Sequence, residues 1–403
     1  MTPPTMTTPE TTTGATHMPA EWEPHERTWM AFPPGNETFG AANSESLTRA
    51  RRAWAEVAAT ISRYEPVSMV VASGDVEAAQ AMLPGAVDVV VHELDDAWMR
   101  DIGPTFVRTE TVGAAGPTGA ASTAGPTSAA GPTSAAGAAD AGDASDGGLA
   151  AVNWTFNGWG AQSWASWESD SLIGRFVGDR AGVPVLDSTL VNEGGGFHVD
   201  GEGTVLLTQT VQLDPGRNPE ATQESVEAEI HARLGTSKAI WLPRGLTRDY
   251  QEYGTRGHVD IVAAFAGPGK VLVHDQTNPA HPDHAVSMMI RSVLEGATDA
   301  HGRALEIINV PAPTVLRDDD GFVDYSYINH YVANGVVVLC AFDDPHDAVA
   351  AEILGSVYPD RKVELVDARE IFANGGGIHC ITQQQPAVLD PVQQFPRQRL
   401  TGR

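Results

Sequence analysis

The chain has 403 residues, 42% of them hydrophobic, and its 52 acidic residues outnumber its 25 lysines and arginines to give a net charge of −27. A chain of this length can bury a large core, whereas so acidic a surface repels nucleic acid and anionic membranes. The stretch 1–16 lacks the basic start and apolar centre of a signal peptide, and two cysteines give no disulfide framework. We therefore expect a cytoplasmic protein without a membrane span.

Hydrophobic periodicity predicts alternating helices and strands. Amphipathic helices are expected at 45–63, 168–181, 219–234, 282–295 and 346–357. Strands are expected at 67–72, 87–93, 104–108, 149–154, 183–191, 203–213, 238–242, 259–265, 270–274, 305–310, 335–342 and 362–366. This order predicts the α/β class, but no Gly-rich phosphate motif opens a helix, which disfavours a simple doubly wound sheet.

Residues 113–148 repeat variants of Ala-Gly-Pro-Thr-Ser and have almost nothing to bury. Such a composition predicts a disordered loop. Because long loops cost little additional entropy, we interpret it as an expanded hairpin connection and not as a domain boundary. We expect a single domain at 18–390, flanked by a disordered tail at 1–17 and a C-terminal tail at 391–403.

Cys380 stands in the stretch Asn374-Gly375-Gly376-Gly377-Ile378-His379-Cys380, followed by Ile381 and a polar amide run. We interpret 378–381 as a strand that presents a thiol beside an imidazole. These surroundings favour a nucleophile over a plain strand-end cysteine, although both interpretations stay open. Cys340 lies in the unbroken apolar run 336–342 and is predicted to be a core residue.

A second stretch, Gly194-Gly195-Gly196-Phe197-His198, repeats the pattern Gly-Gly-Gly-apolar-His found at 375–379. Each copy follows an asparagine within two residues. The repetition suggests pseudo-repeated units that bring equivalent strand ends to one centre.

Other dense groups of reactive side chains lie at 95–104, 192–201 and 256–260. Asp101 is expected in a turn at a strand start, and an extended backbone at 258–260 would place His258 and Asp260 on one face. A thiol, an imidazole and several carboxylates make a poor core but a good receptor for a guanidinium, whose N–H groups match carboxylates in pairs.

Two other functional classes fit parts of the pattern. A metallohydrolase could use His198 with Asp200, His258 with Asp260, or His281 with Asp283 and His284 as zinc or manganese ligands. A non-catalytic guanidino-compound binder would have little reason to keep Cys380. Activity that is lost to chelators and insensitive to thiol alkylation would indicate a metallohydrolase and not a cysteine enzyme.

Together the motifs resemble those of agmatine deiminases, within the bacterial peptidylarginine-deiminase-like branch of the guanidino-group-modifying (pentein) superfamily. The resemblance spans about Met18 to Pro386 and rests on ordered motifs. They are Met18–Glu26, Trp98–Pro104, Asn157–Gly160, Glu193–Gly195, Gly257–Asp260 and the Cys380 stretch. It implies a five-bladed α/β propeller with pseudo-fivefold symmetry and an active site on its axis.

The resemblance also implies roles for individual residues. Cys380 matches the nucleophile, His258 the general acid/base and Glu193 the acid that supports it. Asp101 and Asp260 match carboxylates that clamp the guanidinium, and Trp98 matches a wall of the pocket. The implied reaction converts agmatine and water to N-carbamoylputrescine and ammonia, in putrescine biosynthesis, and requires neither a metal nor an organic cofactor.

One departure from the family pattern concerns the substrate tail. Agmatine deiminases usually carry an acid four residues before the catalytic histidine and an asparagine two before it, where this chain has Gly254 and Arg256. Arg256 is therefore a candidate substrate-binding residue, and an arginine or peptidyl-arginine substrate stays open. The expected partner is a small cationic guanidino compound; the oligomeric state, a homodimer included, is left open.

Overall fold

The computed structural model describes residues 15–109 and 148–388. Most of the predicted loop at 113–148, and the tails up to residue 14 and from 391, lie outside these ranges. Two predicted boundaries are wrong by one or two residues. Thr16 and His17 pair with Thr109 and Arg108, so they belong to a strand and not to the tail. Gly148 pairs with Thr109 and already starts the strand after the loop.

All five predicted helices are confirmed within a few residues. The helices are α1 (Glu45–Ile61), α2 (Val76–Met82), α3 (Met99–Ile102), α4 (Gly158–Ala161), α5 (Ile173–Ala181), α6 (Gln209–Gln212), α7 (Gln223–Leu234), α8 (Asp283–Glu295), α9 (His346–Val357) and α10 (Arg369–Ala373). Local signals explain their ends. The Ser44 side chain accepts from the Leu47 N–H at the start of α1, and Gly235 adopts a left-handed φ of 67° where α7 stops.

The strands of the described residues form five sheets of three or four strands and one small hairpin. The larger sheets contain β1 (Thr16–His17), β2 (His25–Ala31), β3 (Val67–Val71), β4 (Val87–Val91), β5 (Thr105–Thr109), β6 (Gly148–Thr155), β7 (Val185–Val191), β8 (Phe197–Val199), β9 (Thr204–Thr208), β10 (Lys238–Leu242), β11 (Ala263–Gly267), β12 (Lys270–Asp275), β13 (Glu306–Pro311), β16 (Tyr331–Ala333), β17 (Val336–Ala341), β18 (Lys362–Asp367) and β19 (Gln383–Pro386). The hairpin is β14 (Arg317–Asp318) with β15 (Gly321–Phe322).

The five sheets repeat one pairing pattern. In each, a first strand pairs antiparallel with a second, and the second pairs parallel with a third. The sets are β5–β6–β7, β8–β9–β10, β11–β12–β13, β16–β17–β18 and β19–β2–β3. Parallel pairs need crossover connections, which explains why helices alternate with strands along the chain.

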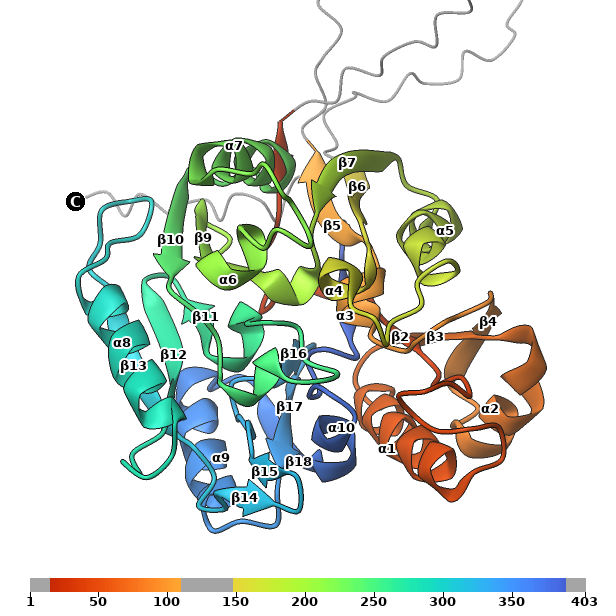
Figure 1. The fold of residues 1–403 in the computed structure, drawn as a ribbon. Helices are drawn as coiled ribbons and strands as arrows, with labels where there is room; N and C mark the ends of the chain where they lie inside the picture. Colours follow the sequence, from red (N-terminus) through yellow and green to blue (C-terminus); the bar gives the residue numbers. More distant parts are fainter. Residues whose placement is uncertain (1–14, 110–147, 389–403) are drawn as a thin grey trace, which may run out of the picture.

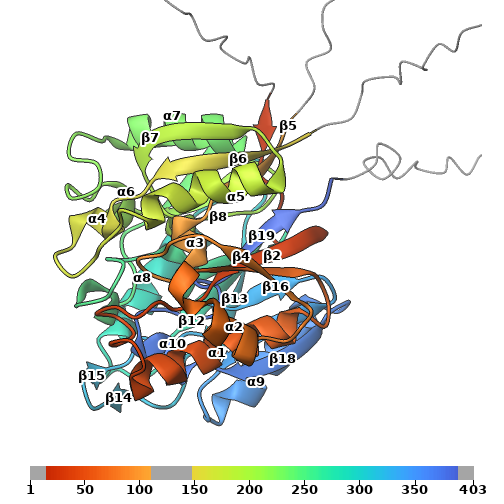
Figure 2. The same cartoon turned by 90° about the vertical axis from the view of Figure 1, so that its right-hand side faces the viewer.

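Helices α1, α5, α7, α8 and α9 lie on the outside of the molecule, with the strands further inside (Figure 1). The last set joins the two ends of the described chain, because β19 pairs with β2 and thereby lies against the N-terminal strands (Figure 2). No helix in the described ranges combines the length and apolar character needed to cross a membrane.

Three stretches predicted as strands differ in the structure. Strand β9 ends at Thr208 and helix α6 follows, so the prediction of one strand over 203–213 is wrong in its second half. Val259–Ile261 forms a 3₁₀ turn before β11, which removes the predicted extended alignment of His258 with Asp260. Residues 378–381 form a turn in which the Ile378 carbonyl accepts from the Thr382 hydroxyl. These residues do not form a strand, and their apolar side chains are buried against the surrounding sheets.

Candidate active site

The predicted site residues gather because each precedes the first strand of a sheet. Asp101 lies in α3 before β5, and Glu193 lies before β8. His258 and Asp260 lie before β11 and Cys380 before β19. Asn329, which was not predicted, lies before β16. All five sheets thus contribute to one buried centre, and the two segments with the Gly-Gly-Gly-apolar-His pattern are among the contributors.

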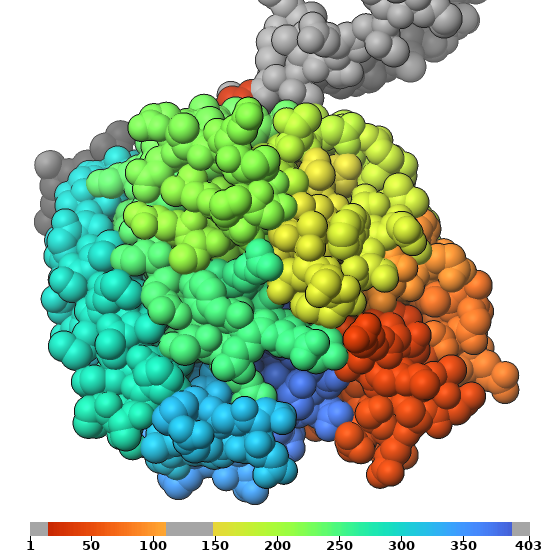
Figure 3. Space-filling model, in the orientation of Figure 1, coloured from red at the N-terminus to blue at the C-terminus, as the bar shows by residue number. Residues whose placement is uncertain are grey.

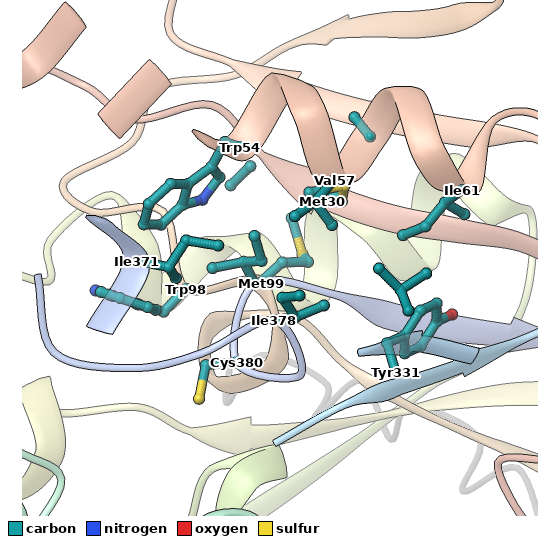
Figure 4. Close-up of a cluster of buried hydrophobic side chains, with 14 of the residues drawn as sticks. Met30, Trp54, Val57, Ile61, Trp98, Met99, Tyr331, Ile371, Ile378 and Cys380 are labelled. Carbon is teal, nitrogen blue, oxygen red and sulfur yellow. The ribbon is translucent and has the colours of Figure 1, made fainter. Parts of the chain in front are cut away.

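Cys380 lies at the edge of a hydrophobic cluster, and its Sγ atom points away from the other labelled side chains (Figure 4). Its backbone is fixed by a hydrogen bond from the Arg100 N–H to the Cys380 carbonyl at 3.0 Å. The Sγ atom lies 3.2 Å from Asn329 Nδ2 and 3.7 Å from Asp260 Oδ2. Burial, together with the charges of Asp260 and Asp101, raises the pKa of the thiol well above its ordinary value.

His258 is held between two carboxylates. Its Nε2 lies 3.2 Å from Glu193 Oε2, and its Nδ1 lies 3.8 Å from Asp101 Oδ1, too far for a hydrogen bond. Nδ1 is buried and has no hydrogen-bond partner among the described residues. Burial lowers the pKa of His258, but Asp101 and Glu193 outweigh it and raise the value to about 9.

Glu193 is fixed from behind by Arg217, which the sequence analysis did not identify. Both Glu193 carboxylate oxygens accept from Arg217 Nε at 3.0 Å, and both side chains are fully buried. Burial raises the pKa of Glu193, but Arg217 and His258 outweigh it and lower the value to about 2. Glu193 therefore stays ionised beside His258.

Asp101 and Asp260 differ in how their oxygens are used. Trp159 Nε1 and the Gly195 N–H donate to Asp101 at 2.9 and 3.1 Å, and burial raises the pKa of Asp101 to about 6. The Oδ2 atom of Asp260 faces His379 Nδ1 at 2.8 Å. Its Oδ1 atom is buried and has no partner in the described ranges.

Glycines leave room for the reactive groups. A Cβ atom at Gly195 would lie 2.4 Å from His258 Nδ1, and one at Gly376 would lie 3.0 Å from Cys380 Sγ. The first distance is shorter than real Cβ atoms essentially ever show, and the second is tighter than nine in ten real Cβ contacts. The two Gly-Gly-Gly stretches thus border the same site.

Trp98 is 4% exposed and packs against Phe39 and Trp54, with its ring also facing Gly376. Arg256 is half-buried, and its guanidinium pairs with Asp214 at 3.2 Å. Asp214 also pairs with Arg217, so Arg256 belongs to the network that supports Glu193. Neither contact tests whether these two residues touch a substrate, and both roles stay predictions.

The predicted metal-ligand sets do not converge. Asp200 accepts backbone N–H groups of Glu202 and Thr204 in a turn, and His284 Nδ1 faces a backbone carbonyl. Among the described residues, Glu21, His198 and His379 could bring three ligand atoms together. The Arg100 guanidinium lies 3.5 Å from Glu21, and a cation next to it would be repelled.

Residues 17–386 match the Porphyromonas-type peptidyl-arginine deiminase family, so the chain belongs to this family. The agmatine deiminase of Medicago truncatula is 35% identical over 396 residues, covering 92% of this chain and 96% of that protein. A Streptomyces coelicolor protein with the provisional name agmatine deiminase is 58% identical over 370 residues, covering 92% and 98%. The solved structure of agmatine deiminase from Enterococcus faecalis superposes with a TM-score of 0.79 at 28% identity, covering 93% of this chain and 97% of that one.

Several supporting residues escaped the sequence analysis. Asn329 contacts the thiol, and Asp249 accepts from the N–H groups of Gly257 and His258, which fixes the backbone of His258. Glu21 lies within the first motif of the family resemblance, which was the one available signal for it. The other two stand in stretches without a distinctive pattern.

Proposed function

We propose that this protein hydrolyses agmatine to N-carbamoylputrescine and ammonia, through a covalent intermediate on Cys380. The observation that carries the proposal is Asp260 Oδ1, a buried oxygen without a partner in the described ranges, on a carboxylate whose other oxygen lies 3.7 Å from the Cys380 thiol. An unpaired buried carboxylate oxygen is costly, so Asp260 Oδ1 requires a ligand with N–H groups and positive charge. A guanidinium between Asp101 and Asp260 supplies these.

The proposed reaction begins when the bound cation offsets the two carboxylates and favours loss of the Cys380 proton to solvent. The thiolate attacks the guanidinium carbon and forms a tetrahedral adduct. His258, charged because its pKa is about 9, gives a proton to the leaving nitrogen, and ammonia departs. The remaining thiouronium is hydrolysed by a water that neutral His258 deprotonates; the carbon–sulfur bond breaks and the product leaves.

The surroundings of the site support an amine tail over a carboxylate tail. A cavity of about 300 Å³ is lined by Asp249, Glu252, Gly254, Asp324 and Gly375, among others. Arg248 also lines it, and its charge is offset by ion pairs with Asp318 and Asp320. Space-filling atoms show a hollow where the segment near residue 250 meets the C-terminal segment (Figure 3). Gly375 is adjacent to Gly376, which borders Cys380. Acidic walls attract the ammonium of agmatine and repel the carboxylate of arginine.

The pairing of Arg256 supports the same choice. Its guanidinium is engaged with Asp214, so its charge is offset and would repel an ammonium only weakly. The alternative substrates, arginine and peptidyl-arginine, would gain from an unpaired arginine at this position.

We further propose that the five repeated sheets form a five-bladed α/β propeller within a single domain. The shared pairing pattern and the supply of one site segment from each sheet support this architecture. Two free thiols support a reducing, cytoplasmic setting.

Ammonia release tests the proposed activity over agmatine, arginine and a peptide with C-terminal arginine. We expect kcat/KM for agmatine to exceed that for arginine in the wild type, and Arg256→Asn to change the ratio by less than about tenfold, because a paired surface charge contributes about 1 kcal/mol. A wild-type preference for arginine that Arg256→Asn reverses would refute agmatine and retain the deiminase chemistry.

A further inference from the structure

A line of buried charges leads to the Oδ2 atom of Asp260. It consists of Arg100, Glu21, His379 and Asp260, none more than 4% exposed except Glu21 at 6%. Arg100 lies 3.5 Å from Glu21 Oε2, and the same oxygen lies 2.9 Å from His379 Nε2. His379 Nδ1 then reaches Asp260 Oδ2 at 2.8 Å. Positive and negative groups alternate as far as the carboxylate next to the nucleophile.

Both ring nitrogens of His379 face carboxylate oxygens. A neutral imidazole has one N–H, whereas an imidazolium donates from both nitrogens. Ionised carboxylates only accept, so both hydrogen bonds exist together when His379 is doubly protonated. Burial and the charge of Arg100 lower the pKa of His379, but Glu21 and Asp260 outweigh them, and the net shift is upward.

The other titratable groups around this line do not supply the charge. His198 stacks on His379 with ring centroids 6.1 Å apart, and its Nδ1 accepts from the Phe265 N–H. Burial lowers the pKa of His198 to about 3 and that of His330 to about 4, so both rings are neutral. Asp260 also faces His258, Arg100, Asp101 and the Cys380 thiol.

The contact with His379 decides the state of Asp260. A buried carboxylate beside a thiol and a second carboxylate tends to take up a proton, which would remove its attraction for a guanidinium. Here the His379 ring hydrogen-bonds to Oδ2 of Asp260, and Oδ1 of Asp260 has no partner among the described residues. Burial raises the pKa of Asp260, but His379 outweighs it and holds the value below its ordinary range.

We propose that His379 is a positioning residue that stays charged: Glu21 holds it as an imidazolium, and it keeps Asp260 ionised with Oδ1 aimed at the guanidinium of the substrate. The inference rests on the proposed guanidino substrate for its consequence in binding. Its structural part, the charge on His379, concerns residues that do not touch the substrate.

The binding test uses Cys380→Ser, which prevents turnover, with and without Glu21→Gln. Agmatine dissociation constants are measured by calorimetry from pH 8 to 5.5. Without the Glu21 charge, His379 releases its second proton more readily and the pKa of Asp260 rises, so the carboxylate protonates as the pH falls. Asp101 also titrates near pH 6 in both proteins. The readout is therefore the dissociation constant measured with Glu21→Gln divided by the one measured without it, at each pH. We expect this ratio to rise by about tenfold or more over the range, since one unit of pKa corresponds to tenfold.

The matched control is Cys380→Ser with His330→Asn, which alters a buried histidine whose Nδ1 faces the Tyr327 carbonyl and not a site carboxylate. Its dissociation constant should keep the pH dependence of Cys380→Ser. A ratio for Glu21→Gln that is the same at every pH would assign Glu21 a merely structural role and overturn the proposal.

Nitrogen NMR of the wild-type histidines tests the charge on His379 without substrate and without a variant that could misfold. At pH 8 we expect both His379 nitrogens to carry protons while His198 shows one unprotonated nitrogen. An unprotonated His379 nitrogen at pH 8 overturns the proposal. If agmatine fails to bind Cys380→Ser while His379 is doubly protonated, the proposed substrate is wrong and the charge on His379 stands.

Discussion

The two Gly-Gly-Gly-apolar-His stretches share a sequence pattern, but their histidines have different partners and are followed by different residues. His198 is buried with a neutral ring that accepts a backbone hydrogen bond, and His379, stacked on it, faces two carboxylates. The next residue is Val199 in the first stretch and Cys380 in the second. The first stretch continues as strand β8, whereas the second turns before β19. A shared motif therefore sets where the backbone lies, and the neighbours of each side chain set its charge and reactivity.

The largest expected effect comes from truncating the residue after each histidine. Cys380→Ala should lower turnover by about 10⁴-fold or more, because the proposed nucleophile is lost, and should leave the fold intact. Val199→Ala, the matched variant in the first stretch, removes two buried methyl groups; it should retain turnover and lose about 2 kcal/mol of unfolding free energy. Ammonia release and urea unfolding measure the two quantities. Turnover of Cys380→Ala within tenfold of the wild type would refute the nucleophile assignment.

The next effect concerns the central glycines. Gly195→Ala places a methyl group against His258, and Gly376→Ala places one against Cys380 and Trp98. We expect each to lower kcat/KM by about 10²-fold, because a displacement near 1 Å of a catalytic group costs that much. Gly355→Ala in helix α9 is the control: its Cβ would lie 3.8 Å from Val363 of strand β18, so activity should not change. Equal activity in all three variants would show that the glycines do not border the site.

The smallest effect separates the two histidines by pH. His198 has a lowered pKa of about 3, so the unfolded state binds its proton more readily between pH 3 and 6.5, and the native state loses stability as the pH falls. The His379 pKa is raised, so its contribution is fully present below 6.5 and is lost as the pH rises through the native value. Relative to the wild type, the unfolding free energy of His198→Gln should therefore rise by up to about 1 kcal/mol for each pH unit of acidification. The unfolding free energy of His379→Gln should fall short of the wild-type value by the least at alkaline pH. Denaturant unfolding across pH measures both differences from the wild type. If the two differences changed with pH in the same direction, the prediction would be contradicted.

Sequence periodicity predicted the five helices and most strands, because their apolar faces follow the helix and strand periods. It misjudged 259–261 and 378–381, where apolar residues are buried in turns that aim His258, Asp260 and Cys380 inward. The motifs identified the groups expected to react with the substrate. They did not identify Arg217 or Asn329, whose partners lie 24 and 51 residues away along the chain. Pairings of this kind follow from the fold and leave no local pattern.

The pairing of β19 with β2 also has a consequence for shortened chains. Strand β2 is interior to its sheet only because residues 383–386 cover one side of it. A chain that ends before residue 383 would expose a row of unpaired backbone groups on β2, an edge to which other chains can add strands. Premature termination near the C-terminus should thus produce aggregation as well as loss of catalysis.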